Sequence, residues 1–334
     1  MFGAYRVLLA LFVVFFHIGD LPQLGGYAVF GFYVLSGYLM TLVMHTNYGY
    51  TLSGATKYLV NRILRIYPIY WLACLLSILI IVMLGSGFAA KFHDALVIPR
   101  DIESILRNVF LIFPNLETPR LTPPSWALTV ELFYYACIGL GLSRTKFLAL
   151  VWLGFALTYH VYVTLAGWGP SNIYFPIPAA ALPFSIGALV FLYRDQLLSA
   201  WPRLTLAPMP YLLLILILAN WAIGLSLWIP DRIGFYVNII LNALLILSLS
   251  KRESLAGVSR QMDRLMGDFS YPIYLVHYQV ALITMAMLSV FGFQFARGDN
   301  VLVMISLPLL FLVAWGLSVI VERPIDRLRR KIRA

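Results

Sequence analysis

Charged side chains are scarce in this chain. They make up 11% of its 334 residues, whereas a soluble domain carries about a quarter. Hydrophobic residues make up 61% and are spread from one end of the sequence to the other. This composition excludes an ordinary soluble protein and leaves little sequence for a separate soluble domain. We therefore predict an all-α membrane protein that crosses the bilayer many times and forms one domain over residues 1–334.

Cysteine is also scarce, because Cys74 and Cys137 are the only two, and both fall in apolar segments. This excludes a disulfide framework and implies no metal site. A cleavable signal peptide is not expected either. The first hydrophobic segment has almost no charged region before it and no small-residue cleavage site before Asp20 and Pro22. We expect this segment to remain as a membrane helix.

Long apolar stretches are what the sequence has in quantity. A bilayer-spanning helix needs roughly 17–25 predominantly apolar residues. About ten such stretches are present, and we predict spans at 2–19, 26–45, 64–84, 124–142, 147–166, 174–193, 209–228, 233–250, 269–291 and 301–321. The longer connection 85–123 contains IPRDIESILRNVFLI, with apolar residues at helical spacing and charges on the other face. This pattern predicts a helix that lies in the membrane interface between spans three and four.

The distribution of lysine and arginine predicts the orientation. With both termini in the cytoplasm, 18 of the 24 basic residues lie on the cytoplasmic side, as the positive-inside rule favours. The other six are Lys91, Arg100, Arg107, Arg120, Arg232 and Arg297. The net charge of +10 is therefore explained by topology and by anionic lipid headgroups, and we expect no nucleic-acid partner.

A few ionisable residues interrupt the apolar segments, where such groups usually mark function. Arg6 and His17 are eleven residues apart, so they share one face of the first helix, separated by roughly 16 Å along its axis. Glu131, in the fourth span, is expected in the same outer half of the bilayer as His17. Arg62 and Arg65 share a face at the inner end of the third span and can hold one polyanion. The layout predicts a catalytic pair, His17 and Glu131, toward the outside and an anion clamp toward the inside.

Each of these residues also has a structural interpretation, which the spacing leaves open. His17 could anchor a helix end or make an interhelical hydrogen bond, and Glu131 could neutralise a buried arginine such as Arg6. Arg62 and Arg65 could simply be positive-inside residues. For His277, near the middle of the ninth span, packing between helices is the default interpretation and lining of the site is the alternative.

Six segments match known motifs in order: the first helix with Arg6 and His17, GFYVLSGYLMT (31–41, with Tyr33 where Phe is more usual), RILRIYPIYW (62–71), SWALTVELFYY (125–135), FSYPIYLVHYQV (269–280) and VERPIDRLRR (321–330). Together they resemble the acyltransferase-3 family of bacterial integral membrane acyltransferases. The resemblance runs over essentially the whole chain. It implies a member that acts without a fused extracytoplasmic hydrolase-like domain.

The resemblance implies an activity and assigns roles to residues. The protein would move an acyl group, usually acetyl, from cytoplasmic acetyl-CoA to a hydroxyl of an extracytoplasmic or lipid-linked glycan, such as lipopolysaccharide or exopolysaccharide, in the bacterial inner membrane. His17 would be the catalytic histidine and Glu131 its carboxylate partner. Donor phosphates would be held by Arg62 and Arg65, with Arg6 in support. Substrate binding is assigned to Ser36, Tyr274 and His277.

The chemistry of histidine agrees with these roles but leaves two routes open. A neutral His17 could remove the proton of the sugar hydroxyl as it attacks the thioester, or could accept the acyl group first and pass it on. Two other functional classes share some of these features. A transporter or flippase for a lipid-linked glycan would also bury such residues, although the halves show no obvious inverted repeat. A structural partner in polysaccharide export would explain the apolar composition but not the polar residues.

Overall fold

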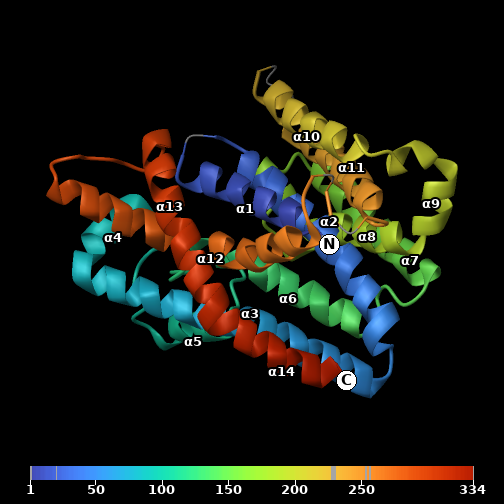
Figure 1. The fold of residues 1–334 in the computed structure, drawn as a ribbon, viewed down its shortest axis with the longest axis horizontal. Coiled ribbons are helices and arrows are strands. Elements are labelled where there is room, and N and C mark those ends of the chain that lie inside the picture. Colours follow the sequence, from blue (N-terminus) through green and yellow to red (C-terminus); the bar gives the residue numbers. More distant parts are fainter. Residues whose placement is uncertain (1, 20, 227–230, 253, 256, 334) are drawn as a thin grey trace.

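The structure is a computed structural model that describes residues 2–19, 21–226, 231–252, 254–255 and 257–333. Over these residues the chain is helical and contains no strand, which confirms the predicted all-α membrane protein (Figure 1). The α-helices are α1 (Gly3–His17), α2 (Leu24–Val43), α3 (Leu52–Leu84), α4 (Ser86–Phe92), α5 (Ile102–Phe110), α6 (Trp126–Gly139), α7 (Lys146–Leu165), α8 (Ile177–Leu192), α9 (Arg194–Ala200), α10 (Met209–Ser226), α11 (Asp231–Leu249), α12 (Arg260–Val290), α13 (Asn300–Leu317) and α14 (Arg323–Arg333).

The number of membrane spans differs from the ten expected. Seven of the described helices are long and apolar enough to cross a bilayer, and the pair α8 and α9, bent by 77°, adds an eighth if it counts as one span. Each predicted span has a helix, but α1 has 15 residues and α6 has 14. At 1.5 Å per residue they reach about 21–23 Å, less than the roughly 30 Å hydrocarbon core. The end of the predicted span 209–228 lies outside the described residues.

Two helices begin earlier than the hydropathy predicts. α3 begins at Leu52 rather than near residue 64, because the hydroxyl of Thr51 accepts a hydrogen bond from the amide of Gly54 and caps a polar first turn. Likewise α12 begins at Arg260 rather than near 269, capped by Ser259. Hydropathy marks only the apolar part of a helix, so the polar turns were missed. As a result, Arg62 and Arg65 lie about three turns inside α3 rather than at its start.

Close helix contacts place α1 and α2 at the centre of the bundle (Figure 1). α1 packs between α2 and α12, and α2 packs against α8. Glycine permits these approaches: a Cβ at Gly37 of α2 would lie 2.1 Å from the carbonyl oxygen of Phe184 in α8. On the other side, a Cβ at Gly3 would lie 1.6 Å from the carbonyl oxygen of Asp263 in α12. Small residues at such contacts are the usual means of tight helix packing in membranes.

The connection between α3 and α6 contains the expected amphipathic helix, α5. Asp101 caps it by accepting a hydrogen bond from the amide of Ser104 at 2.7 Å. Three α3 side chains then hold its end by donating to backbone carbonyls at positions 108–110: Tyr67, Tyr70 and Trp71. Its apolar residues remain exposed on the other face, including Ile102, Ile105, Leu106 and Val109. The helix is confirmed, and its location in the membrane interface stays a prediction.

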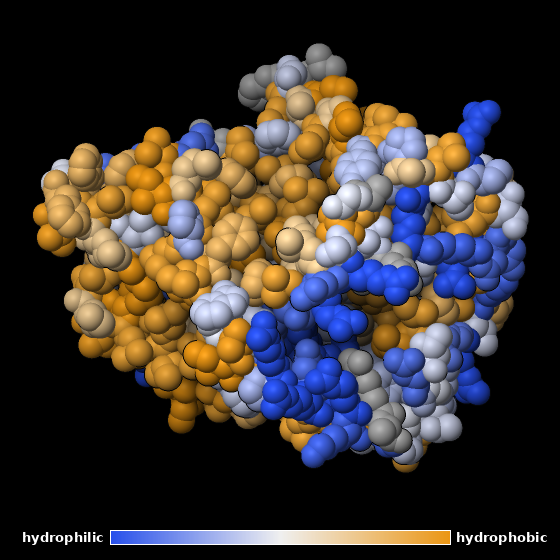
Figure 2. Space-filling model, in the orientation of Figure 1, coloured by the Kyte–Doolittle hydropathy of each residue, from blue (hydrophilic) through white to orange (hydrophobic). Residues whose placement is uncertain are grey.

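The surface separates into apolar and polar regions. In Figure 2 hydrophobic side chains cover most of the visible face, and hydrophilic side chains gather over the start of α12 and over α14. An apolar outer surface is expected where helices contact lipid rather than water.

Candidate active site

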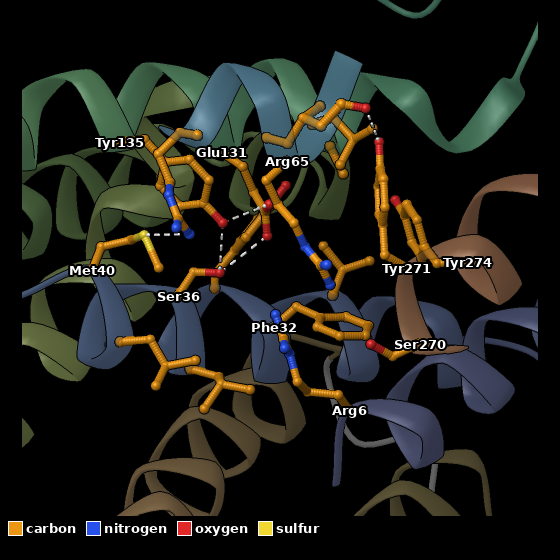
Figure 3. A pocket seen from close by; sticks show the side chains of 18 residues that line it. Arg6, Phe32, Ser36, Met40, Arg65, Glu131, Tyr135, Ser270, Tyr271 and Tyr274 are labelled. Carbon is orange, nitrogen blue, oxygen red and sulfur yellow. Dashed lines mark hydrogen bonds between the residues drawn. The ribbon is translucent and has the colours of Figure 1, made fainter. Parts of the chain in front are cut away.

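A cavity lies among α1, α2, α3, α6 and α12 (Figure 3). Its polar lining includes Arg6, Ser36, Arg62, Arg65, Glu131, Tyr135, Ser270 and Tyr271. Its apolar lining includes Val29, Leu35, Leu39, Ile66 and Leu128. We call this space the inner cavity. In Figure 3 the side chains of Arg6 and Arg65 point into the same space. Three guanidinium groups around one cavity make it suited to a polyanion with an apolar arm.

Glu131 belongs to this cavity and is held by two hydroxyl groups. Its carboxylate accepts hydrogen bonds from Ser36 Oγ at 3.1 Å and from the Tyr135 hydroxyl at 2.8 Å. The cations that act on it electrostatically are Arg6 and Arg62. This environment fits the interpretation of Glu131 as the countercharge of buried arginines.

The two arginines of α3 are held from the C-terminal segment. Arg65 forms a salt bridge of 3.0 Å with Glu322, whose side chain is only 4% exposed. Arg62 donates to Asn61 Oδ1 at 3.2 Å, and Asn61 is held in turn by Arg329 of α14, which donates its Nε–H to the same oxygen at 2.9 Å. The segment 318–322 is a π-helical turn, a feature often found at functional sites.

Sequence reasoning missed the roles of Asn61, Glu322 and Arg329. The motif VERPIDRLRR contributes to the family resemblance, but by itself it indicates no function for its residues. A carboxylate in an apolar context just before a basic helix was the available signal, because a buried carboxylate needs a cation nearby.

His17 lies elsewhere, paired with His277 of α12. Its Nδ1 is 3.0 Å from His277 Nε2, and the two rings are parallel within 4°. His277 Nδ1 lies 2.8 Å from the carbonyl oxygen of Tyr274. A carbonyl oxygen can only accept, so His277 must donate its Nδ1–H and keeps a lone pair on Nε2. His17 then donates its Nδ1–H to that lone pair, which leaves the Nε2 of His17 unprotonated and able to act as a base or nucleophile.

The structure therefore brings together most of the predicted site residues, but in two groups. Arg6, Ser36, Arg62, Arg65, Glu131 and Tyr274 line the inner cavity, whereas His17 and His277 form a separate pair. Among the described residues, His17 and Glu131 share no hydrogen bond or salt bridge, so the expected contact between them is not formed. Tyr274 connects the groups: its side chain borders the inner cavity, and its carbonyl holds His277.

The inner cavity is bordered by a second, polar pocket at the N-terminal end of α1. Arg6 lines both spaces. The second pocket is also lined by Gly3, Arg252, Arg260, Asp263, Arg264, Gly267 and Asp268. Its residues come from segments that the positive-inside rule assigns to the cytoplasm.

Comparison with known proteins identifies the family of the chain. No curated protein and no solved structure gave a match. A family model described as an acyltransferase domain matches residues 4–323, nearly the whole chain. The chain therefore belongs to the acyltransferase-3 family and is a membrane acyltransferase.

Proposed function

We propose that the protein transfers an acyl group, acetyl in the first instance, from acyl-CoA on the cytoplasmic side to a hydroxyl of an extracytoplasmic or lipid-linked glycan. The observation that carries this proposal is the inner cavity, in which Arg6, Arg62 and Arg65 surround an apolar space next to a polar pocket. Coenzyme A has the matching chemistry, with several phosphates and a long, thin pantetheine arm. The bacterial inner membrane is the proposed location.

The donor would enter through the pocket at the N-terminal end of α1. Its phosphates would meet the guanidinium groups, which bind phosphate oxygens through paired, charge-assisted hydrogen bonds. Its arm would extend between the apolar side chains of α2 and α6. In this arrangement Glu131 balances the arginines and orients Ser36 and Tyr135, rather than acting on His17.

The reaction would take place at His17. Its Nε2 would accept the proton of the acceptor hydroxyl while the hydroxyl oxygen bonds to the thioester carbonyl carbon, and the carbon–sulfur bond would then break. The proton would pass to the departing thiolate of CoA. In the alternative route Nε2 attacks the thioester itself, and the carbon–sulfur bond breaks as the thiolate of CoA leaves. In a second step the hydroxyl oxygen takes the acyl group from the imidazole, the carbon–nitrogen bond breaks, and the hydroxyl proton passes to the thiolate.

A thioester in the inner cavity would have to pass two aromatic side chains to reach His17. Phe32 and Tyr274 both line the cavity and meet edge to face, with ring centroids 5.9 Å apart. Tyr274 also donates its hydroxyl to the carbonyl of Pro124 at 2.8 Å. We propose that these rings separate when the loaded donor binds.

The experiment is transfer of label from [¹⁴C]acetyl-CoA to extracted membrane glycans by the purified protein in phosphatidylcholine nanodiscs. We expect labelled glycan with the wild type and none with His17→Ala at matched yield. Rapid quenching without acceptor separates the two routes, because only the relay puts label on the protein at His17. Absence of CoA binding together with absence of transfer would refute the proposal.

A further inference from the structure

A third pocket lies at the C-terminal end of α1, opposite the polar pocket at its N-terminal end. It is lined by Phe16, Gly19, Leu21, Pro22, Lys91, Phe92, His93, Asp94, Arg297 and Gly298. We call it the outer pocket, because residues 91–94 and 297–298 both belong to segments assigned to the outer side by the positive-inside rule. It is formed next to the helix turn that carries His17.

Arg297 is fixed directly at this helix end. Its Nε–H donates to the carbonyl oxygen of His17 at 2.9 Å, and the amide of Gly298 donates to the carbonyl of Ile18 at 2.8 Å. The loop before α13 is thus attached to the last turn of α1. The contact to His17 uses Nε, so it leaves both terminal amino groups of the guanidinium to meet a ligand. The positive charge of Arg297 interacts electrostatically with both His17 and His277.

The described residues that line the pocket carry more positive than negative charge. They include two cations, Lys91 and Arg297, and one carboxylate, Asp94, and within the described residues neither cation forms a salt bridge. His93 adds no charge near neutral pH, because burial, and then the nearby Arg297 and Arg120, lower its pKa to about 4. Two cations against one carboxylate favour an anionic ligand.

We infer that the outer pocket binds the acceptor saccharide through an acidic group on that saccharide, a carboxylate or a phosphate, which Arg297 and Lys91 hold at the His17 end of α1. This rests on the proposed function, in which His17 deprotonates or acylates the acceptor. A guanidinium can bind either anion with two parallel hydrogen bonds.

The remaining walls suit a sugar ring. Phe16 is partly exposed and supplies apolar surface beside the charged groups. Most of the remaining lining is polar, which suits the hydroxyl groups of a sugar, and fixed polar groups in a site set the orientation of a ligand. Binding the acidic group at Arg297 would fix one end of the sugar and leave a hydroxyl to approach the histidine pair.

The test compares three probes by calorimetric titration into the protein in phosphatidylcholine nanodiscs: octyl β-D-glucuronide, octyl β-D-glucoside 6-phosphate and octyl β-D-glucoside. We expect at least one acidic probe to bind the wild type about 10-fold or more tightly than the neutral one, the range for charge-assisted hydrogen bonds. Arg297→Gln and Lys91→Gln should each remove most of that preference, and Arg297→Lys should restore part of it. Arg100→Gln is the control. It removes an equal charge from the 85–123 connection that contains Lys91, at a residue that does not line the pocket, and should leave the preference for acidic probes intact.

Three results would overturn the inference: equal binding of acidic and neutral probes, an unchanged preference in both glutamine variants of the pocket, or an equal loss in Arg100→Gln. If phosphatidylglycerol displaces the probes and the acidic sugars bind no more tightly than the neutral one, the pocket is assigned to a lipid headgroup instead. CoA titrations on the same samples test the donor side separately. Normal CoA binding and glycan labelling with no acidic preference would reject this inference alone.

Discussion

His17 and His277 are in contact, and the direction of the hydrogen bonds between them decides which of the two can act as a base. The carbonyl of Tyr274 fixes the tautomer of His277, and His277 fixes that of His17. His277 is therefore a positioning residue in the proposed reaction, and the reactive lone pair is that of His17 Nε2. In serine hydrolases a carboxylate has the corresponding task of orienting the base.

Replacement of His277 tests this assignment. His277→Ala should lower kcat about 100-fold or more, the size of a general-base contribution, and leave the KM for acetyl-CoA near normal. His277→Gln should recover part of the rate, because its amide oxygen can accept the Nδ1–H of His17. The measurement is steady-state transfer with both variants at wild-type thermal stability. Equal kcat in wild type and alanine variant would show that the pair is only a packing contact.

Arg62 offers the sharper test of donor binding, because its Nε has no hydrogen-bond partner among the residues that the structure describes. Loss of a charge-assisted phosphate contact costs about 1.5–3 kcal/mol, or roughly 10- to 150-fold in affinity. We expect Arg62→Gln to raise the Kd for CoA by that factor and Arg62→Lys to raise it less. Calorimetric titration of CoA measures both. An unchanged Kd would show that Arg62 does not bind the donor and would favour its interpretation as a positive-inside residue.

At the scale of elements, the C-terminal segment holds the donor arginines. The π-helical turn 318–322 positions Glu322 against Arg65, and α14 holds Asn61 through Arg329. Removing one partner of a buried ion pair leaves the other charge unpaired, at a cost of about 3–5 kcal/mol.

Arg65→Ala should therefore lower the thermal stability of the protein, and Glu322→Gln added to it should restore most of the loss. CoA titration of the stable double variant then reports the contribution of Arg65 to donor binding without the folding defect. If the single variant keeps its melting temperature, the salt bridge contributes nothing measurable to stability.

The loop 93–101 gives a prediction about pH. His93 has a pKa lowered from 6.5 to about 4, chiefly because it is buried, so the folded protein keeps it neutral. Its Nδ1 accepts the amide of Ala95 at 3.0 Å. As pH falls below 6.5, the unfolded chain binds a proton that the folded protein does not, so stability decreases until about pH 4.

We expect His93→Gln to reduce this acid sensitivity, by about 1 kcal/mol between pH 6.5 and 5. Melting temperatures of wild type and variant in the same nanodiscs at pH 7.5, 6 and 5 measure it. Parallel pH profiles would contradict the assignment of His93 as a neutral buried group.

The sequence allowed prediction of the elements better than of their contacts. Apolar stretches indicated a helix at each expected position, and the inner-cavity residues Arg6, Arg62, Arg65 and Glu131 were singled out because ionisable groups are costly in a membrane. Hydropathy gives the depth of a residue in the bilayer but not the direction its helix face points. The sequence placed Glu131 at the depth of His17 and His277 near the middle of the ninth span. The packing of α1 against α12 brings His277, and not Glu131, into contact with His17.

At the scale of the whole molecule, α1 joins three spaces. Its first turns border the polar pocket at its N-terminal end and the inner cavity at Arg6, and its last turn borders the outer pocket at Phe16. A helix of 15 residues places those ends about 20 Å apart. Donor and acceptor could thus approach from opposite sides, with the reactive histidine nearer the acceptor side.

This division requires a particular topology, with both termini in the cytoplasm and the 85–123 loop outside. Cysteine labelling in intact cells tests it, on a background of Cys74→Ala and Cys137→Ala. Asn115 is exposed in the long loop and Gln261 is exposed in the first turn of α12, so cysteines at both positions can react when reagent reaches them. A cysteine at Ser259, two residues earlier, would remove the hydroxyl that caps α12, so Gln261 is the labelling position. A maleimide that cannot cross the membrane should label Asn115→Cys at once and Gln261→Cys only after permeabilisation. The reverse pattern would exchange the donor and acceptor sides and assign the outer pocket, with Arg297, to the cytoplasm.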